Sequence, residues 1–490
     1  MLFNSYIFIF VFLPITILGF FFIPKIRNFR FSFLWLTLAS LFFYGYWNFK
    51  YLLILLTSIL VNYVFGQLLD RNKQKSARAK GLLVCGTIFN LGLLGYYKYA
   101  DFVVNSINSS FKTNLPNLNI VLPLAISFYT FTQIAYLVDV YKGETKEQKY
   151  DLISYTLFVS FFPQLIAGPI LRHNELIPQF HKLSIFRFSE ENFAKGVTLF
   201  ILGLSKKVII ADNLSPWVTL VFNNADSVSF LEAWIGAISY TFQLYFDFSG
   251  YSDMAIGLGW MFNIQLPINF NSPYKATSII DFWRRWHITL SNFLRDYLYI
   301  PLGGNRLGEF RRYINLIITM LLGGLWHGAG WTFVIWGGMH GLLLVINQIW
   351  RRLGISIPKF LAWILTFHGI LLSWVLFRAK TFADAFHIIK VMTGIEGILL
   401  PHTFKIFLNW VPIGGIFKGW QELLYLPPIG GKNSLIILFI VFVSTLTLPN
   451  TQELMSRFKP NLRTAILTSM LATTCFLFFN RISEFLYFQF

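Results

Sequence analysis

The chain has 490 residues, of which 55% are hydrophobic and 19% aromatic, and its formal net charge is +18. Charged residues make up 13% of it, about half their share in ordinary soluble domains, and the mean hydropathy is +0.58. These values exclude a soluble globular protein. The positive charge does not require nucleic acid, because cytoplasmic loops of membrane proteins collect Lys and Arg. Cys85 and Cys475 are the two cysteines, so no disulfide framework is expected.

Apolar runs of the length that crosses a bilayer, about 20 residues, recur from end to end. They lie near residues 6–24, 31–49, 51–69, 82–98, 120–140, 152–170, 194–211, 230–246, 314–325, 332–350, 358–377, 434–449 and 463–480. We therefore predict an all-α polytopic integral membrane protein with about eleven transmembrane helices. No long polar block interrupts it, so residues 1–490 are expected to form one membrane-embedded domain.

The loops between these runs predict the sidedness of the chain. Lys and Arg gather at residues 25–30, 70–80 and 142–149. The positive-inside rule places these three loops in the cytoplasm and the N-terminus outside. Residues 100–119 are polar and carry Asn and Ser, which predicts an outer loop.

Three further features precede the centre of the chain. The run at 152–170 contains proline and glycine, so a kinked membrane span is expected there. Residues 171–192 are polar and predict a surface segment in which His173 and His181 are solvated. Lys207 lies near a predicted helix end and is expected to extend to the interface.

Residues 247–310 break the pattern of clean spans. Ten charged residues and several prolines occur there among many aromatic residues. Within it, residues 281–299 show helical spacing, with aromatic residues on one face and polar residues, His287 among them, on another. Two interpretations fit: an amphipathic helix at the membrane interface, or a helix that dips inward and lines a funnel.

Residues 326–331 read WHGAGW and lie between two apolar runs. An ionisable group at membrane depth usually faces a protein interior or a wet cavity and marks function, which singles out His327. The alternative is a helix break with one hydrogen-bonded histidine. If residues 327–340 formed one unbroken helix, His340 would lie about 20 Å from His327. We therefore expect His340 to be a packed, hydrogen-bonded histidine.

Five ordered motifs make the chain similar to a known family. They are YFDFSGYSDM (245–254), DFWRRWHITLS (281–291), RDYLYIPLGGNR (295–306), GLWHGAGWTF (324–333) and WGGMHG (336–341). This motif core, 245–341, resembles the membrane-bound O-acyltransferase family, and most closely the bacterial branch typified by the alginate O-acetyltransferase membrane subunit. Weaker matches include SFYTF (127–131), FPQLIAGP (162–169), SWVLFR (373–378) and YFQF (487–490).

The resemblance implies that His327 is catalytic and that His287 is the second polar position of the active site. The residues fit that chemistry. Imidazole is suited to take the proton of an attacking hydroxyl near neutral pH. The reaction also needs a hydrogen-bond donor to the oxyanion. His287 or a tryptophan N–H would supply it. Direct transfer without an acyl-enzyme is the simpler mechanism.

The resemblance further implies acetyl-CoA as the acyl donor, with no bound cofactor and no metal. Donor or substrate contacts are expected from Arg284, Arg285, Arg295, Trp326, Trp331 and Asn305. Arginines bind phosphate well. For the three arginines the alternatives are interfacial anchoring and ion pairs with Asp281 and Asp296.

The leading hypothesis is an O-acetyltransferase of the bacterial cytoplasmic (inner) membrane that serves an exported or cell-wall polysaccharide, of the alginate, cellulose or peptidoglycan type. The acetyl group would come from cytoplasmic acetyl-CoA and reach a hydroxyl on the outer face, with the help of a periplasmic partner protein. Membrane lipid and the polysaccharide are the other expected partners, and nucleic acid is not. The alternatives are a D-alanyl transferase for teichoic acid and a multipass transporter, although a transporter would show a second broken centre.

Overall fold

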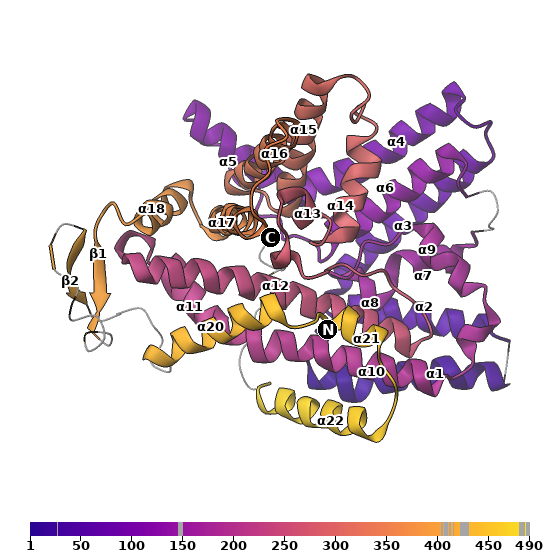
Figure 1. Cartoon of the computed structure of the whole chain (residues 1–490). Helices are drawn as coiled ribbons and strands as arrows, with labels where there is room; N and C mark the ends of the chain where they lie inside the picture. The colour runs from indigo at the N-terminus through magenta and orange to yellow at the C-terminus, as the bar shows by residue number, and fades with distance from the viewer. Residues whose placement is uncertain are drawn as a thin grey trace. The chain divides into compact units, whose positions relative to one another are not determined.

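The computed structural model describes residues 1–26, 28–145, 150–402, 405, 410, 413–414, 416–421, 431–479 and 486. Arg27, residues 146–149 of one basic loop and the motif at 487–490 lie outside these residues. The described chain is mainly helical (Figure 1). One small parallel sheet, β1 (Ile398–Pro401) with β2 (Phe417–Gln421), departs from the predicted all-α class. The contacts divide the chain into two compact units, which the single predicted domain did not anticipate.

The first unit comprises Met1–Leu204, Tyr251–Asn269 and Thr451–Asn480. Its helices are α1 (Leu13–Ile26), α2 (Arg30–Gly45), α3 (Phe49–Asp70), α4 (Ala77–Leu94), α5 (Ala100–Phe111), α6 (Ile126–Lys142), α7 (Leu152–Ser160), α8 (Phe162–Leu165), α9 (His173–Phe180), α10 (Glu190–Ser205), α21 (Thr451–Ser456) and α22 (Leu462–Leu477). Its buried polar side chains pair across helices. Asn62 and Asn90, for example, exchange amide hydrogen bonds of 3.1 and 2.6 Å.

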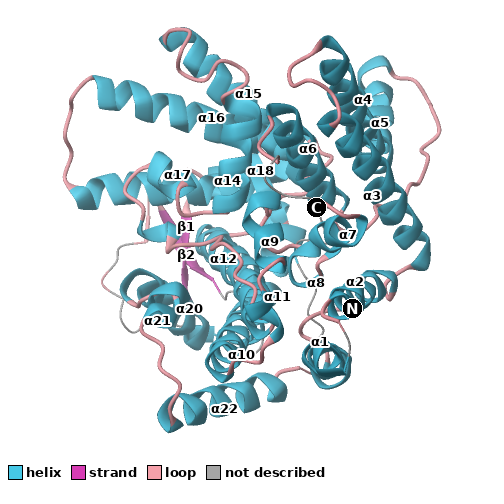
Figure 2. Ribbon diagram, turned by 90° about the vertical axis from the view of Figure 1, so that its right-hand side faces the viewer, coloured by secondary structure: helices cyan, strands magenta, loops and turns pink. Residues whose placement is uncertain are grey.

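The second unit comprises Ser205–Gly250, Phe270–Asn450 and Arg481–Phe490. Its helices are α11 (Asp212–Asn223), α13 (Ile279–Trp283), α14 (Ile288–Leu294), α15 (Glu309–His327), α16 (Trp331–Arg352), α17 (Lys359–Arg378), α18 (Phe382–Met392) and α20 (Gly431–Thr447). The long helix α12 (Phe230–Met261) carries the chain from this unit into the first. Figure 2 shows α16 and α17 as two long helices joined at one end by a loop.

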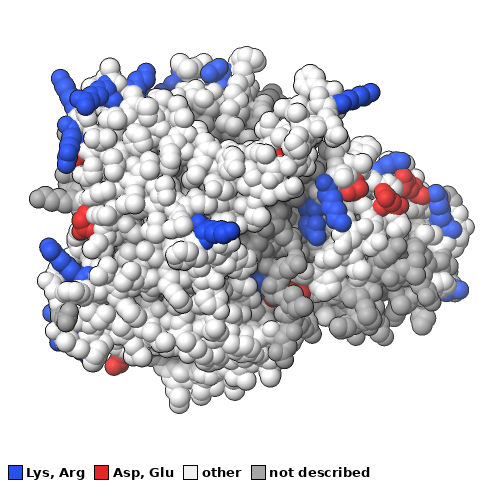
Figure 3. Space-filling view, turned by 180° about the vertical axis from the view of Figure 1, so that it is seen from behind, with Lys and Arg blue, Asp and Glu red and all other residues white. Residues whose placement is uncertain are grey.

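Among the described residues, five helical stretches are long and apolar enough to cross a membrane. They are Phe8–Ile26, Phe49–Asp70, Ala77–Phe111, Trp331–Arg352 and Lys359–Arg378. Many large apolar side chains of these stretches are exposed, and Figure 3 shows broad areas of one face without charged side chains. Such a surface suits contact with lipid. The chain is therefore a multi-pass membrane protein, as predicted.

The segment 152–170 is broken, as its proline and glycine predicted: α7 ends at Ser160 and the short α8 follows over Phe162–Leu165. Its flanking residues come together, since the Tyr150 hydroxyl lies 2.5 Å from Nδ1 of His173. Its broken backbone is satisfied inside the protein, since Gln164 donates to the carbonyl of Phe158 and Ser40 Oγ accepts from the amide of Phe162. Irregular backbone at membrane depth needs such partners.

Two predictions about element boundaries are wrong. Residues 100–119 were expected to form a loop, but α5 continues α4 through a π-helical turn as far as Phe111. The break predicted at residue 247 begins only after α12 ends at Met261. Asp247 fits inside α12 because it lies 2.6 Å from Lys207, which also lies 2.7 Å from Asp212. Lys207 is thus buried in an ion pair and does not extend to the interface.

The single amphipathic helix predicted over 281–299 is divided into three parts. Helix α13 ends at Trp283, α14 begins at Ile288, and a π-helical turn follows over Arg295–Tyr299. Between α13 and α14, His287 adopts the left-handed conformation, with φ 42° and ψ 53°. That conformation is unfavourable for a residue with a Cβ and is usually retained at functional sites.

Helices α15 and α16 form a tight hairpin across the turn at 328–330. Their backbones touch where glycines face each other: a Cβ on Gly324 would lie 2.2 Å from the carbonyl oxygen of Phe333 and 3.1 Å from Cα of Gly337. A side chain at either position would force the helices apart. This close approach fixes the end of α15, and therefore the position of His327.

Candidate functional site

His287 and His327 lie side by side, as expected from the sequence. Their ring centroids are 6.4 Å apart. His327 is the last residue of α15 and is 8% exposed, while His287 is fully buried. Two imidazoles from different elements therefore share one buried centre within the second unit.

Aromatic side chains surround this centre. The ring of His327 lies 4.9 Å from Trp326, 5.2 Å from Trp336 and 5.5 Å from Phe377. The ring of His287 lies 4.7 Å from Phe248 and 6.1 Å from Trp326. These side chains come from α12, α15, α16 and α17, so four helices hold the two imidazoles. We call the seven residues the histidine centre: Phe248, His287, Trp326, His327, Trp336, Phe377 and, against His287, Phe270.

The histidine centre excludes water. His287 lies between α13 and α14, outside the candidate membrane spans. Complete burial lowers its pKa to about 3, so its ring is neutral at physiological pH. A neutral imidazole donates through one nitrogen and accepts through the other, which suits a hydrogen bond to a developing oxyanion.

His340 is held differently. Nε1 of Trp283 donates to its Nδ1 at 3.3 Å, and its Nε2 lies 2.9 Å from Oγ of Ser373. Since Ser373 itself donates to the carbonyl of Ile370, Nε2 of His340 carries the proton and donates. Both nitrogens are engaged in structural hydrogen bonds, which confirms the prediction of a packed histidine.

A pocket of about 560 Å³, lined by both polar and apolar side chains, opens between α13, α14, α15 and α16. Arg284, Arg295 and Asn305 line it, with Arg312 and Gln348 on the facing helices. Thr319, Met320 and Trp283 also line it. The ring of Trp283 lies 6.1 Å from Trp336, which contacts His327. We call this cavity the arginine pocket.

The chain is similar to characterised enzymes over most of its length. Residues 144–356 match the membrane-bound O-acyltransferase family. The chain is 49% identical over 433 residues to the peptidoglycan O-acetyltransferase of Helicobacter pylori. The aligned region covers 83% of this chain and 82% of that protein. This chain belongs to the membrane-bound O-acyltransferase family. It is also 44% identical over 435 residues to the probable alginate O-acetylase AlgI of Pseudomonas aeruginosa, covering 87% of this chain and 81% of that one.

Membership of the membrane-bound O-acyltransferase family confirms the predicted enzyme class and removes the transporter alternative. A teichoic acid D-alanyltransferase of Bacillus subtilis is more distant, at 27% identity over 288 residues, which is 54% of this chain and 71% of that protein. The acetyl-transferring relatives thus share far more of the sequence than the D-alanyl-transferring one.

The six predicted donor or substrate residues divide by position. Arg284, Arg295 and Asn305 line the arginine pocket, and Trp326 belongs to the histidine centre. Arg285 does not line the pocket. Its Nε donates to Oδ1 of Asp281 at 2.9 Å and its guanidinium also donates to the carbonyl of Asn271, so it follows the ion-pair alternative.

Arg295 and Trp331 are both largely exposed. Arg295 makes a bidentate ion pair with Asp296, at 2.6 and 2.9 Å, which was the alternative considered for the arginines, yet its side chain is 57% exposed and lines the arginine pocket. Trp331 begins α16 and is 59% exposed. It is therefore much more exposed than the other aromatic residues of this region. Trp336, five residues further on, is buried and lies against the ring of His327.

Several residues of these sites were not singled out from the sequence, among them Phe248, Arg312, Trp336 and Phe377. Trp336 and Phe377 lie inside motifs that carry the family resemblance, which is the signal that would have found them. Arg312 donates to Gln348 across the α15–α16 hairpin, and its position depends on that pairing. Within the described residues, no group of three or more His, Cys, Asp or Glu side chains is placed to hold a metal ion.

Proposed function

We propose that this protein transfers an acetyl group from cytoplasmic acetyl-CoA to a hydroxyl on the outer face of the bacterial cytoplasmic membrane, for O-acetylation of an exported or cell-wall polysaccharide. The observation that carries the proposal is the pair of buried imidazoles, 6.4 Å apart, in a protein whose arginine pocket is lined in part by α15, the helix that ends at His327. Relatives named for peptidoglycan and alginate acetylation support the acceptor class.

His327 acts as the general base in this proposal. It removes the proton of the acceptor hydroxyl while the oxygen attacks the thioester carbonyl. The tetrahedral oxyanion receives a hydrogen bond from the neutral ring of His287 or from a tryptophan N–H. When the carbon–sulfur bond breaks, the imidazolium of His327 returns its proton to the departing thiolate. The products are an O-acetyl ester and free CoA, and no acyl-enzyme is required.

The charge pattern of the second unit supports entry of the donor from the cytoplasm. The arginine pocket lies toward the basic end of the α15–α16 hairpin, which carries Arg311, Arg312, Arg351 and Arg352. The positive-inside rule places that end in the cytoplasm. Acetyl-CoA is a polyanion, and exposed Arg284 and Arg295 suit its phosphates. His327 ends α15, a helix of 19 residues that is about 28 Å long, so it lies toward the opposite face.

The first unit supports the same sidedness. The side chain of Gln74 occupies the space that a Cβ on Gly143 would need, so the basic loop at 70–80 lies against the end of α6 at Gly143. We further propose that the chain crosses the membrane about eleven times. A funnel from each face would then meet the other near His327. A periplasmic partner that carries the acetyl group onward also belongs to this proposal, because a polymer outside the membrane cannot itself enter a closed aromatic centre.

Inside-out membrane vesicles from cells that overproduce the protein provide the test. Labelled acetyl-CoA is added to the exposed cytoplasmic face, and label is measured in the polysaccharide fraction as acetate released by mild base. We expect release that depends on the protein and disappears in His327→Ala vesicles with equal protein content. Transfer only from a D-alanyl-loaded carrier protein, or none from acetyl-CoA, would overturn the proposal.

A further inference from the structure

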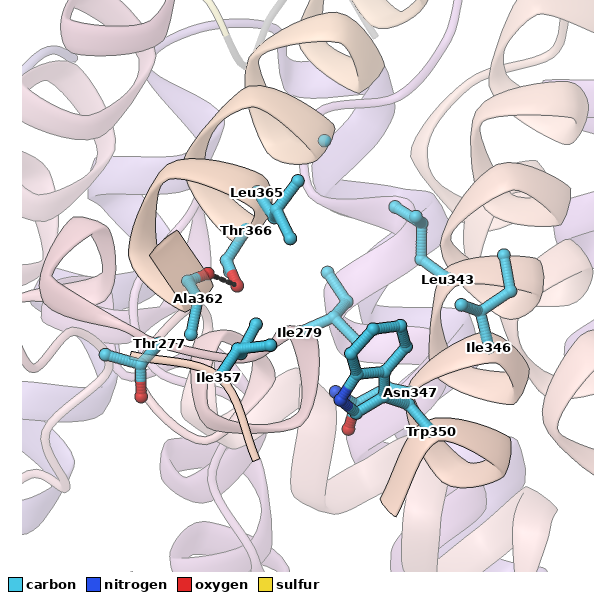
Figure 4. Close-up of a pocket in the computed structure, with 11 residues that line it drawn as sticks. Thr277, Ile279, Leu343, Ile346, Asn347, Trp350, Ile357, Ala362, Leu365 and Thr366 are labelled. Atoms are coloured by element: carbon cyan, nitrogen blue, oxygen red, sulfur yellow. Dashed lines mark hydrogen bonds between the residues drawn. The ribbon is translucent and has the colours of Figure 1, made fainter. Parts of the chain in front are cut away.

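A second cavity lies on the other side of α16 from the arginine pocket. It has a volume of about 230 Å³ and is lined by Thr277, Ile279, Leu343, Ile346, Asn347, Trp350, Ile357, Ala362, Leu365, Thr366 and Gly369. Figure 4 shows these residues around an open space; most come from α16 and α17, while Thr277, Ile279 and Ile357 come from α13 and the neighbouring loops. We call it the apolar groove. Neither His287 nor His327 lines it.

The groove is mainly apolar; Asn347, Thr277, Thr366 and Trp350 are the lining residues with polar side-chain groups, and two of these groups bond to backbone carbonyls. The hydroxyl of Thr366 donates to the carbonyl of Ala362 in its own helix, at 2.7 Å (Figure 4), and this leaves the methyl group for the groove. Nε1 of Trp350 donates to the carbonyl of Ile355, so the indole lies at the end of α16. A mainly apolar cavity of this kind offers chiefly dispersion contacts.

Both walls are candidate membrane spans, Trp331–Arg352 and Lys359–Arg378. Large side chains next to the groove, such as Leu342 and Leu361, are exposed at 54% and 47%. At that depth the surrounding medium is hydrocarbon. A helix with its side chains is about 10 Å wide and does not fit a space of this volume, whereas a single hydrocarbon chain does.

The mouth of the groove is basic. It opens at the end of the hairpin where α16 finishes with Arg351 and Arg352 and α17 begins with Lys359, and all three side chains are exposed. Arg352 pairs with Glu309. No acidic residue occurs between Glu309 and Asp384 in the sequence, so Arg351 and Lys359 present positive charge that the neighbouring chain does not balance. Such a cluster attracts anionic headgroups.

We propose that the apolar groove binds one acyl chain of an anionic phospholipid, with the headgroup phosphate at Arg351 and Lys359. The ligand is a structural lipid at the cytoplasmic leaflet, separate from the acetyl donor and from the acceptor. It fills the space between the parts of α16 and α17 that lie nearest their connecting loop. This inference concerns a site that the proposed function does not use, and its failure would leave that function untouched.

The purified full-length protein in detergent is titrated with phosphatidylglycerol and with phosphatidylcholine of the same chains, and bound lipid is counted by native mass spectrometry. We expect phosphatidylglycerol to be retained and phosphatidylcholine to be retained more weakly. Each basic residue near an anionic surface changes the affinity by about fivefold. Arg351→Gln should therefore weaken retention of phosphatidylglycerol by about that factor. Lys380→Gln, the same charge change at the far end of α17, should not.

The groove itself is tested by Gly369→Leu. Glycine 369 lies on the wall, and a Cβ there makes ordinary contact with Leu343, at 3.7 Å, so the longer side chain fills the space without disturbing the helix. Leucine also favours the helical state, which keeps the variant folded. Loss of the tightly held lipid is expected. Unchanged lipid retention in Gly369→Leu, or equal retention of the two lipids by the unmodified protein, would overturn the proposal.

Discussion

His173 and His327 are both buried histidines, but their rings meet different neighbours. Nε2 of His173 lies 3.2 Å from a carboxylate oxygen of Asp139, and its Nδ1 lies 2.5 Å from the hydroxyl of Tyr150. The ring of His327 lies among two tryptophans, a phenylalanine and a second imidazole. The first arrangement uses both nitrogens to join three elements of the first unit. The second places an imidazole in an aromatic enclosure at the end of a helix.

The difference separates structural from chemical use of the same residue. A histidine between a carboxylate and a hydroxyl fixes the protein around it, and its removal leaves a buried charge. A histidine enclosed by rings at the end of a helix, beside a second imidazole, is placed to exchange a proton with a substrate. Substitutions at the two positions should therefore change different measurements.

The largest effect is expected from His327→Ala. Loss of a general base lowers rates by about 10²–10⁴-fold. We expect the initial rate of acetyl transfer per folded molecule to fall in that range, while the melting temperature changes little. The measurement uses purified protein in vesicles with labelled acetyl-CoA. His340→Ala is the control, because that ring is held by Trp283 and Ser373; a comparable loss of rate there would remove the distinction.

His173→Ala is expected to act on stability. It leaves the carboxylate of Asp139 buried without its imidazole, and breaking a buried pair costs about 3 kcal/mol of the free energy of unfolding. Denaturant titration in detergent micelles measures this. Tyr150→Phe removes only the hydroxyl and should cost about 1 kcal/mol. If His173→Ala instead unfolds like the unmodified protein but transfers acetyl poorly, the roles assigned to the two regions are wrong.

A smaller effect distinguishes two adjacent arginines. Arg284 lines the arginine pocket, whereas Arg285 is paired with Asp281. A charge-assisted contact to phosphate is worth about a tenfold change in binding. Arg284→Gln should therefore raise KM for acetyl-CoA about tenfold and leave kcat nearly unchanged. Arg285→Gln should leave KM unchanged, and equal KM values for the two variants would contradict the assignment of the pocket to the donor.

The smallest effect is expected at Trp331. This side chain is 59% exposed, whereas Trp326 and Trp336 are buried against the ring of His327. Exposed positions usually change free energies by no more than about 0.5 kcal/mol, so Trp331→Ala should alter the transfer rate by about twofold at most. Trp336→Leu, which opens the enclosure, should lower the rate much further. A larger loss of rate in Trp331→Ala than in Trp336→Leu would contradict this assignment.

The sequence predicted the histidine centre because its signals are local. The glycines beside His327 and the clustered tryptophans mark a helix break at membrane depth, and the order of motifs carries the family. Three arginine-pocket residues, Arg284, Arg295 and Asn305, follow from those motifs as well. The local sequence did not show that residues 281–299 form more than one helix, because the apolar spacing continues on both sides of the left-handed residue His287.

What the sequence could not predict depends on distant partners. His173 reads as a surface residue until Asp139 and Tyr150 are brought to it by α6 and the following loop. Asp247 and Asp253 read as the start of a polar break. They lie inside α12 because Lys207 and the hydroxyl of Thr451, at 2.7 Å from Asp253, match them. Whether a charged residue lies inside a membrane helix can be predicted only when its oppositely charged or hydrogen-bonding partner is known.

The most direct test asks whether His327 takes a proton or merely holds the site together. Acetyl transfer to a sugar hydroxyl needs a base, whereas hydroxylamine attacks a thioester without one. With the sugar acceptor, His327→Ala should be slower than the unmodified protein by about 10²–10⁴-fold. With hydroxylamine, after subtraction of the uncatalysed reaction, the same variant should be slower by less than about tenfold. An equal deficit with both nucleophiles would contradict a role for His327 as the base.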